Sequence, residues 1–382
     1  MTRFALLVVA TSLAACVDTL PPLDETTSLR VELLAPTDPG TSDQRLPDTA
    51  RSAQIRVTAV DAQGEIDTEF DYSTQVYAQF LGTLTPELGR APLAIVALQD
   101  GVSTPTTVML PPVYGPTVLW VEDGGAEGSY ATGTSPILWF RDPYVADIQT
   151  PESETALDAL SSSPLETKQI KVTGSRYGER GRLVVNGTYA QGYTLSDVEC
   201  ADAQGTPPCV AGPYDHLLIF SFQRPRDERG RNINAGQFID GFTGGVQEFN
   251  GLTEIGFPQS FVTEADPIVV NEARIPEPVL IEESWLTNKI LFERAEAGLV
   301  AMNNVTVCEL DDDYATYKQW KVDIGAGCGS PINVITAGVT EFDPAARVGQ
   351  PIAHLVGTLR PVNIGTFNVW IVFPRTGADL TP

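Results

Sequence analysis

The sequence predicts an all-β protein. Many short apolar runs are separated by glycine, proline, asparagine and aspartate, which favour turns over long helices. The chain of 382 residues holds 33 glycines and 29 prolines, and 42% of its residues are hydrophobic. Residues 54–60 alternate polar and apolar side chains, which is the pattern of a strand with one buried face. The apolar content is sufficient for real cores, and the length suits about two or three domains.

The first sixteen residues have the order of a secretory signal. Arg3 precedes an apolar run at 4–10 that is too short to span a bilayer, and 13–16 reads Leu-Ala-Ala-Cys. This ending resembles the lipobox of bacterial lipoproteins. The resemblance implies cleavage before Cys16 and acylation of its thiol and of the new amino terminus. The alternative is an ordinary signal peptide cut at Ala14-Ala15, which leaves Cys16 as a free thiol.

The organisation along the chain follows from composition. We expect a signal peptide at 1–15, a polar tether at 16–28, a first domain at 29–147, a linker with one helical turn at 148–166, and further domains at 167–275 and 276–382. No later stretch is apolar over about 18 residues, so no transmembrane helix is predicted. The lipid would attach the protein to the cell envelope, and we expect the outer membrane of a Gram-negative bacterium. Val17 and Asp18 leave inner versus outer membrane open.

The first domain is predicted to be a β-sandwich. Strands are expected at 29–34, 53–60, 75–80, 93–98, 106–110, 117–122, 129–132 and 137–140. Ile55, Val57, Ala59, Asp61 and Gly64 follow the pattern I-x-V-x-A-x-D-x-x-G. In this the segment resembles bacterial immunoglobulin-like repeats, which implies a spacer or an adhesive module.

The second half contains a weak internal repeat. Residues 245–258 and 357–374 each read as a strand, an Asn/Gly turn and a second strand that ends at Phe-Pro. Strands are expected before the first copy at 169–174, 181–185, 189–195 and 217–222, and before the second at 299–308, 317–324 and 333–337. Five strands per copy, with a hairpin last, fit a small Greek-key barrel.

Several short segments of this half resemble the oligonucleotide/oligosaccharide-binding (OB) barrels of extracellular bacterial nucleases and their lipoprotein relatives. They are 170–174, 192–197, 218–221 and 245–258 in the first copy, and 298–300, 304–307, 370–371 and 373–375 in the second. The resemblance implies two OB-like barrels. It does not extend to nucleic-acid binding, because no nuclease domain is attached and neither copy is basic.

A helix is predicted between the two barrels, over 280–297. Its apolar residues recur at three- and four-residue steps, and Gly298 is a suitable stop. We expect this helix to cap the second barrel, with Trp285 in the core and not in a ligand platform.

The cysteines predict two disulfides. With Cys16 assigned to lipid, four remain, and the simplest of the three connectivities closes each loop locally. Cys200 and Cys209 lie in one loop that contains Gly and Pro, and Cys308 and Cys328 flank an expected hairpin. Zinc is the competing use, but the chain has no Cys-x-x-Cys and only two histidines.

The sequence offers little for catalysis. His216 and His354 are interpreted as structural or edge residues, and the hydrolase, metalloprotease and phosphate-loop motifs are absent from the sequence. A net charge of −25 argues against binding to nucleic acid and to anionic lipid. We therefore expect no enzyme activity and no cofactor.

Two charged segments are candidate binding sites. The run Asp311–Asp313 offers carboxylates for calcium, but its spacing does not match an EF-hand, and a solvated hairpin tip is preferred. The loop at 224–231 is the basic cluster of the chain, and with nearby aromatic residues it could form a groove for an anionic ligand. The residues of this candidate groove are Tyr193, Phe220, Phe222, Arg224, Arg226, Arg229 and Arg231. The alternative is an exposed loop that Asp227 and Glu228 neutralise.

The function expected from these observations is non-catalytic binding or scaffolding at the cell envelope, with the membrane and an envelope protein or glycan as partners. The alternative is binding of oligosaccharide or single-stranded nucleic acid on the barrel faces, in support of a separate enzyme.

Overall fold

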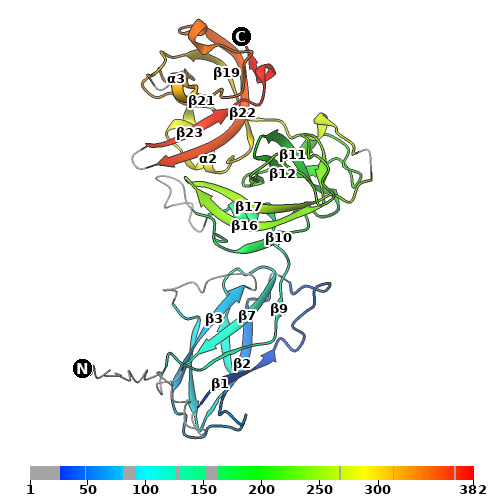
Figure 1. The fold of residues 1–382 in the computed structure, drawn as a ribbon, viewed down its shortest axis with the longest axis vertical. Coiled ribbons are helices and arrows are strands. Elements are labelled where there is room, and N and C mark those ends of the chain that lie inside the picture. Colours follow the sequence, from blue (N-terminus) through cyan, green and yellow to red (C-terminus); the bar gives the residue numbers. More distant parts are fainter. Residues whose placement is uncertain are drawn as a thin grey trace, which may run out of the picture.

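The computed structural model describes residues 26–47, 49–80, 91–125, 130–151, 162–265, 268–312, 314–364 and 367–382. The predicted signal peptide and Cys16 lie outside these residues. The described chain is all-β, as predicted, and forms three sheets that follow one another in sequence. We call them the first unit (strands β1–β9), the second unit (β10–β17) and the third unit (β18–β24). Figure 1 shows an elongated molecule with the second unit between the other two.

The first unit is one sheet around one core. Its strands are β1 (Ser28–Ala35), β2 (Ser52–Val60), β3 (Ser73–Phe80), β4 (Ala94–Gln99), β5 (Val102–Ser103), β6 (Thr106–Met109), β7 (Pro116–Glu122), β8 (Thr132–Thr134) and β9 (Leu138–Trp139). The order is β1-β2-β5-β4-β3-β7-β8, with β6 beside β2 and β9 beside β7. Ile55, Val57 and Ala59 are fully buried, so the predicted alternation of β2 is confirmed. A Cβ on Gly133 would lie 1.8 Å from the Leu29 carbonyl oxygen, so β8 returns to β1.

The second unit is an open ring of strands. It contains β10 (Gln169–Val172), β11 (Gly181–Tyr189), β12 (Gly192–Cys200), β13 (Cys209–Val210), β14 (His216–Phe220), β15 (Phe238–Ile239), β16 (Gly241–Phe249) and β17 (Leu252–Phe261). The order is β10-β16-β17-β14-β12-β11-β15, with β14 and β17 parallel. A pairing of β11 with β16 would close the ring. Instead β16 pairs with β10 and β11 pairs with β15, so the ring stays open.

The third unit is a closed ring. Its strands are β18 (Val279–Leu280), β19 (Leu299–Val307), β20 (Gln319–Asp323), β21 (Ile332–Ile335), β22 (Pro351–Ile364), β23 (Phe367–Phe373) and β24 (Leu380–Thr381). The order β19-β20-β21-β23-β22 is closed by a pairing of β19 with β22, and β21 runs parallel to β23. The predicted repeat therefore has a structural counterpart, because β12-β14-β17-β16 and β20-β21-β23-β22 have the same order and the same parallel step.

Helical segments are short. They are α1 (Val145–Gln149), α2 (Ile290–Glu293), α3 (Tyr314–Tyr317) and the 3-10 turns η1 (Gly178–Arg180), η2 (Glu272–Arg274), η3 (Glu283–Leu286), η4 (Pro344–Arg347) and η5 (Gly377–Asp379). No helix in the described ranges is long and apolar enough to cross a membrane.

The long helix predicted at 280–297 is wrong. The segment begins as strand β18, which pairs with β19, and continues through η3 and α2. The pairing takes the first residues out of helical geometry, and Thr287 and Asn288, which have modest helix propensity, interrupt the rest. Ile281, Trp285 and Phe292 still face the core of the third unit as predicted, with Trp285 6% exposed, whereas Leu280 is exposed on β18.

The expected linker at 148–166 also differs from the structure. Residues 152–161 lie outside the described residues, but Ile148 and Leu165 on either side are buried in the core of the second unit with Val145. The second unit therefore takes core residues from a segment whose composition predicts a linker.

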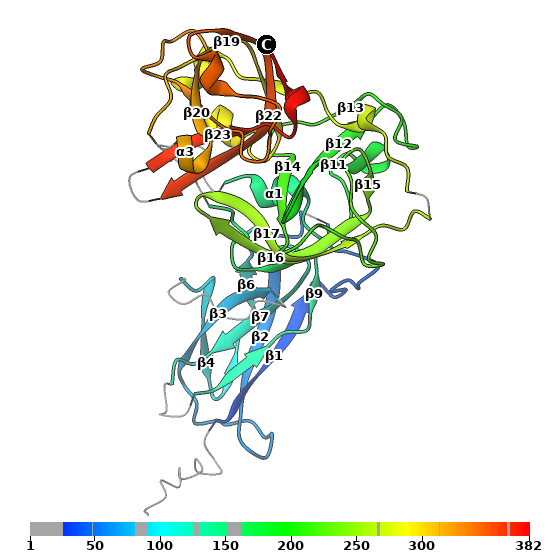
Figure 2. The ribbon, with the colours of Figure 1, turned by 45° about the horizontal axis from the view of Figure 1, so that its top comes forward.

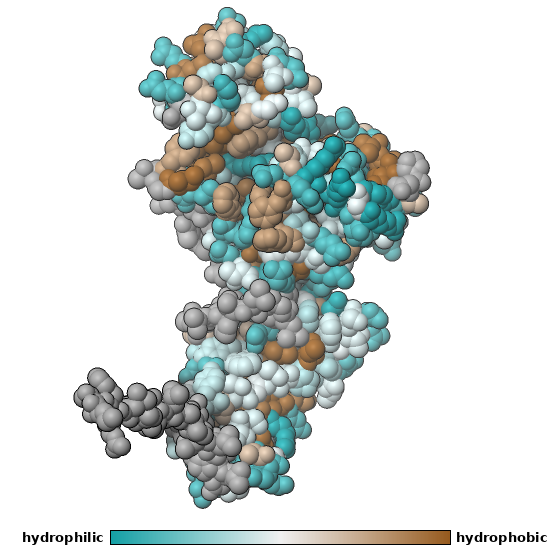
Figure 3. Space-filling model, in the orientation of Figure 1, coloured by the Kyte–Doolittle hydropathy of each residue, from teal (hydrophilic) through white to brown (hydrophobic). Residues whose placement is uncertain are grey.

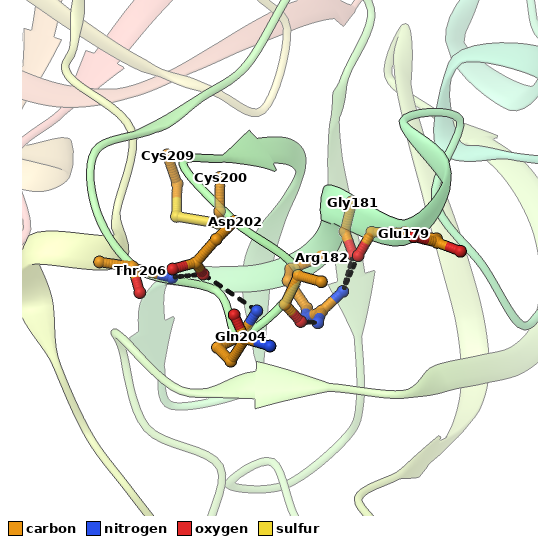
Figure 4. Close-up of a disulfide and its surroundings, with 9 residues drawn as sticks. Glu179, Gly181, Arg182, Cys200, Asp202, Gln204, Thr206 and Cys209 are labelled. Atoms are coloured by element: carbon orange, nitrogen blue, oxygen red, sulfur yellow. Dashed lines mark hydrogen bonds between the residues drawn. A yellow bond between two sulfur atoms is a disulfide. The ribbon is translucent and has the colours of Figure 1, made fainter.

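Both predicted disulfides are present. Cys200 and Cys209 sit opposite each other on β12 and β13, and Asp202 organises the intervening loop by accepting the N–H groups of Gln204 and Thr206 (Figure 4). Cys308 follows β19 and bonds to Cys328 beyond β20. The enclosed segment contains α3 and β20 where the sequence predicts a hairpin.

Candidate functional site

The predicted aromatic groove does not include Tyr193. This side chain is 1% exposed, and its hydroxyl lies 2.7 Å from the Ser260 Oγ inside the second unit. Burial raises the pKa of the Tyr193 phenol above its ordinary value. Tyr193 is a core residue and cannot contact a ligand.

Half of the predicted arginine cluster is paired with the carboxylates of its own loop, so the neutralised loop that the sequence leaves open as an alternative is found in part. The Arg231 Nε lies 2.6 Å from the Asp227 carboxylate, and its other nitrogens donate to the Val262 and Glu264 carbonyl oxygens. The Arg229 Nε lies 3.5 Å from Glu228. Arg224 and Arg226 are exposed. Among the described residues, neither of these two arginines has a carboxylate partner.

A cluster of three phenylalanines occupies the surface beside this loop. Phe220 ends β14, Phe222 follows it, and Phe257 lies in β17. The ring of Phe222 is centred 5.1 Å from that of Phe220 and 5.2 Å from that of Phe257. Phe222 is 66% exposed and Phe257 is 77% exposed. We call these three residues the phenylalanine patch.

The backbone at Phe257 supports a functional interpretation of this patch. Its φ is +51°, in the left-handed region that a bulky residue rarely adopts. Such conformations cost free energy and concentrate at functional positions. Phe257 lies where the pairing of β16 with β17 shifts register, and this irregularity presents its large apolar side chain to the surface. The sequence did not identify Phe257, because it reads there as the end of a strand before proline.

A second apolar patch lies where two hairpins meet. The Asn363 N–H donates to the Asn250 carbonyl oxygen at 2.7 Å, which joins the tip of β22 to the β16–β17 turn. Phe249, Ile364 and Phe367, at these tips, are 60%, 58% and 42% exposed. Figure 3 shows this apolar surface along the β22–β23 hairpin, with further apolar surface on the second unit.

The two histidines have structural positions, in keeping with their interpretation from the sequence. The His216 Nδ1 lies 2.5 Å from the Ser196 Oγ, which also accepts from the Asn186 amide. Burial, with a smaller effect of Arg176, lowers the pKa of His216 to about 4. Ser196 is fully buried, so this Ser-His pair cannot meet a substrate. His354 is exposed on β22 and bonds to Asn303.

Next to His216 lies a buried acidic pair. The Arg176 guanidinium lies 2.8 Å from the Asp215 Oδ2, and the Tyr177 hydroxyl donates to the same oxygen at 2.6 Å. Asp197 accepts the backbone N–H of Arg176 at 3.0 Å. Burial raises the pKa of Asp197 to about 7 and also raises that of Asp215. The guanidinium therefore pairs with Asp215, whereas Asp197 is bound through a backbone N–H group.

The acidic run at 311–313 lies between β19 and α3. Asp311 and Asp312 are exposed and Asp313 lies outside the described residues. The Lys321 ammonium lies 2.5 Å from the Asp311 carboxylate. Within the described part of the chain, no group of three histidine, cysteine, aspartate or glutamate side chains is arranged to hold a metal ion.

Comparisons with known proteins give no family. No protein-family model and no curated protein matches this sequence. One similar solved structure is that of dimeric latent PorU from Porphyromonas gingivalis, at 10% identity and a TM-score of 0.22. The match covers 91% of this chain, and the chain spans 34% of that protein. A likeness this low carries no argument about fold or function.

Proposed function

We propose that this protein is an exported, lipid-anchored protein of the cell envelope with a non-catalytic binding role. The two disulfides indicate an oxidising compartment outside the cytoplasm. The order of charge, apolar run and Leu-Ala-Ala-Cys before residue 17 supports attachment through lipid on Cys16. Two or more acyl chains would anchor it firmly, because each buried methylene contributes about 0.8 kcal/mol.

The strand orders support the domain types that the sequence predicts. We regard as OB-like a five-stranded Greek-key ring in which the third and fifth strands are parallel. The ring β19-β20-β21-β23-β22 has this order, with β21 parallel to β23. The second unit follows the same order with its ring open. For the first unit, antiparallel strands that curl around one core are compatible with an immunoglobulin-like spacer.

The observation that carries the binding role is the phenylalanine patch. Its exposed rings offer a negative π-face, which attracts the weakly positive C–H bonds of a sugar ring. The chain as a whole carries −25, which disfavours an anionic polymer, and in the loop beside the patch Arg229 and Arg231 are paired with Glu228 and Asp227. The ligand class we propose is therefore a neutral oligosaccharide.

The test is glycan binding by the full chain and by a Phe222→Ala, Phe257→Ala variant. We expect the double variant to lose about tenfold or more in affinity for neutral glycans, since two exposed contact rings are removed. Phe249→Ala is the matched control, because Phe249 is also an exposed phenylalanine of the second unit but lies outside the patch. Equal affinity of the double variant and the control would contradict the proposal.

An Arg224→Ala, Arg226→Ala variant distinguishes a neutral ligand from an anionic one. If the ligand is neutral, this variant binds as the unchanged protein does at low and high salt. Salt-sensitive binding that this variant loses would instead favour an anionic ligand, such as single-stranded nucleic acid.

A further inference from the structure

The second and third units are joined by polar contacts and by a small apolar cluster of Leu218, Leu252 and Ala297. The Tyr214 N–H donates to the Arg294 carbonyl oxygen at 2.8 Å, and the Arg375 Nη1 donates to the Asn186 carbonyl oxygen at 3.1 Å. Gly298 lies so close to the ring of His216 that a Cβ would stand 2.4 Å from it. Figure 2 shows the third unit lying over the β14 and β17 side of the second. The two units therefore meet through matched surfaces.

Three glutamates meet in this interface. Glu248 comes from β16 of the second unit, and Glu293 and Glu296 come from the segment that leads into β19 of the third. Glu293 is 6% exposed and Glu296 is 3% exposed. Thr253 of β17 connects the two sides, since its N–H donates to the Glu296 Oε1 at 3.0 Å and its hydroxyl donates to the Glu248 Oε1 at 2.7 Å.

In each carboxyl group one oxygen is unsatisfied, and for Glu296 burial has the larger effect on the pKa, which a hydrogen bond with Gln149 opposes. Among the described residues, the Oε2 atoms of Glu248, Glu293 and Glu296 are buried and have no hydrogen-bond partner. A buried carboxylate oxygen without a donor is costly, whereas a protonated carboxyl group carries its own donor. Three such oxygens in one interface are explained if the cluster holds protons when the units are docked.

The charged neighbours increase this tendency. Glu166 and Glu254 both raise the pKa of Glu248, after the larger effect of burial. Burial raises the pKa of Glu254, whereas Arg360 of β22, whose guanidinium lies over the rings of Tyr189 and Phe373, has the opposite effect on that pKa. Two further titratable residues lie near the cluster. Arg294 follows Glu293 in the sequence, and His216 of β14 lies against Gly298.

We propose that Glu248, Glu293 and Glu296 form a proton-operated latch that holds the second and third units together in acid and loosens them in alkali. The latch would set the relative position of the two units.

The direction follows from the linkage of protonation to docking. Burial, with a smaller effect of Glu248, raises the pKa of Glu293 to about 8, and burial followed by Glu293 and Glu248 raises that of Glu296 well above its ordinary value. The pKa of a free glutamate is 4.5. Docked units therefore hold protons that separated units release, so docking weakens as the pH rises from 4.5 to about 8.

The experiment measures amide hydrogen exchange of the full chain at about pH 5 and about pH 9, corrected for the intrinsic rate. The reporters are the Thr253, Tyr214 and Asn363 amides, which donate across the interface. We expect their protection to be about tenfold or more lower at the higher pH. Glu293→Gln with Glu296→Gln keeps the shape and cannot ionise, so it should keep the acid level of protection at both values.

Two further variants keep the test decisive. Glu277→Gln is the control, since Glu277 is exposed, and it should behave as the unchanged protein. Glu248→Gln replaces the double variant if that one does not fold, and it should reduce the pH dependence. Protection in the unchanged protein that does not depend on pH would overturn the proposal. Protection restored at high pH by calcium chloride, and lost in the double variant, would also overturn it in favour of a cation site.

Discussion

The second and third units share a strand order but use it differently. In the third unit β19 pairs with β22, so the ring closes and the interior is filled by apolar side chains around Trp320. In the second unit β11 and β16 take other partners, so the ring stays open. Buried polar residues such as Asn186, Ser196, Asp197 and His216 lie in the open unit, and Asn186 contacts the third unit directly.

This difference shows what closure of the ring does for a small barrel. A closed ring satisfies its own backbone groups and can hold a dry core. An open ring leaves groups that another element must cover. In the second unit α1, β10 and the segment around Glu296 provide that cover, so the open ring becomes a docking surface.

The largest expected effect is in the closed ring. Trp320→Ala should destabilise the protein by about 3–5 kcal/mol, because it removes a fully buried indole and leaves a cavity. Urea unfolding measures this free energy. Phe222→Ala, which removes an exposed aromatic ring from the open unit, should change it by no more than about 0.5 kcal/mol. Similar effects of both substitutions would contradict the assignment of core and surface.

Removing the disulfides compares the two units directly. The Cys308–Cys328 bond spans 20 residues and the Cys200–Cys209 bond spans 9. From the entropy of loop closure we expect a loss of about 3 kcal/mol for the double serine variant of the first pair and about 2.5 kcal/mol for that of the second. Thermal unfolding with and without reductant checks both values. A larger loss in the second unit would show that the open ring depends more on its disulfide than loop length predicts.

His216 gives the open unit a pH dependence of opposite sign to the latch. Its pKa in the folded protein is about 4, compared with 6.5 when free. Its contribution is fully present above pH 6.5 and is lost as the pH falls towards 4, by about 3 kcal/mol at most. Titration of its imidazole by NMR, assigned with His216→Gln, checks this. An imidazole that protonates near pH 6.5 in the folded protein would contradict its burial.

The smallest effects concern a hydrogen bond made by an aromatic side chain on each of the equivalent strands β12 and β20. The Tyr193 hydroxyl of β12 bonds to Ser260, and the Trp320 Nε1 of β20 donates to the Thr336 Oγ1 at 3.2 Å. Tyr193→Phe and Thr336→Val should each cost about 0.5–1.5 kcal/mol in the free energy of unfolding. A loss well above that in only one unit would show that the two aromatic residues are not equivalent.

The sequence predicted the disulfides and many of the longer strands because both depend on local signals, although the strand expected at 189–195 crosses the turn between β11 and β12. The alternation around Ile55, the turn at Asn250 and the short spacing of the cysteines are read within a few residues. The repeated hairpin also predicted the common strand order of the second and third units.

Features that depend on distant contacts could not be predicted. Ile148 and Leu165 look like linker residues until the second unit buries them. Glu293 and Glu296 read as the polar face of a helix, and only the packing of two units shows that they are buried. The exposure of Phe257 likewise depends on a backbone conformation that its sequence does not signal.

The central claim is that a lipid on Cys16 holds this disulfide-bonded, acidic protein at the cell envelope. Intact mass spectrometry of the protein purified from a membrane fraction tests it most directly. We predict a mature product that lacks residues 1–15, carries acyl mass on Cys16, and has its other four cysteines oxidised in pairs. A cytosolic product with residues 1–15 in place and every thiol reduced would contradict the account.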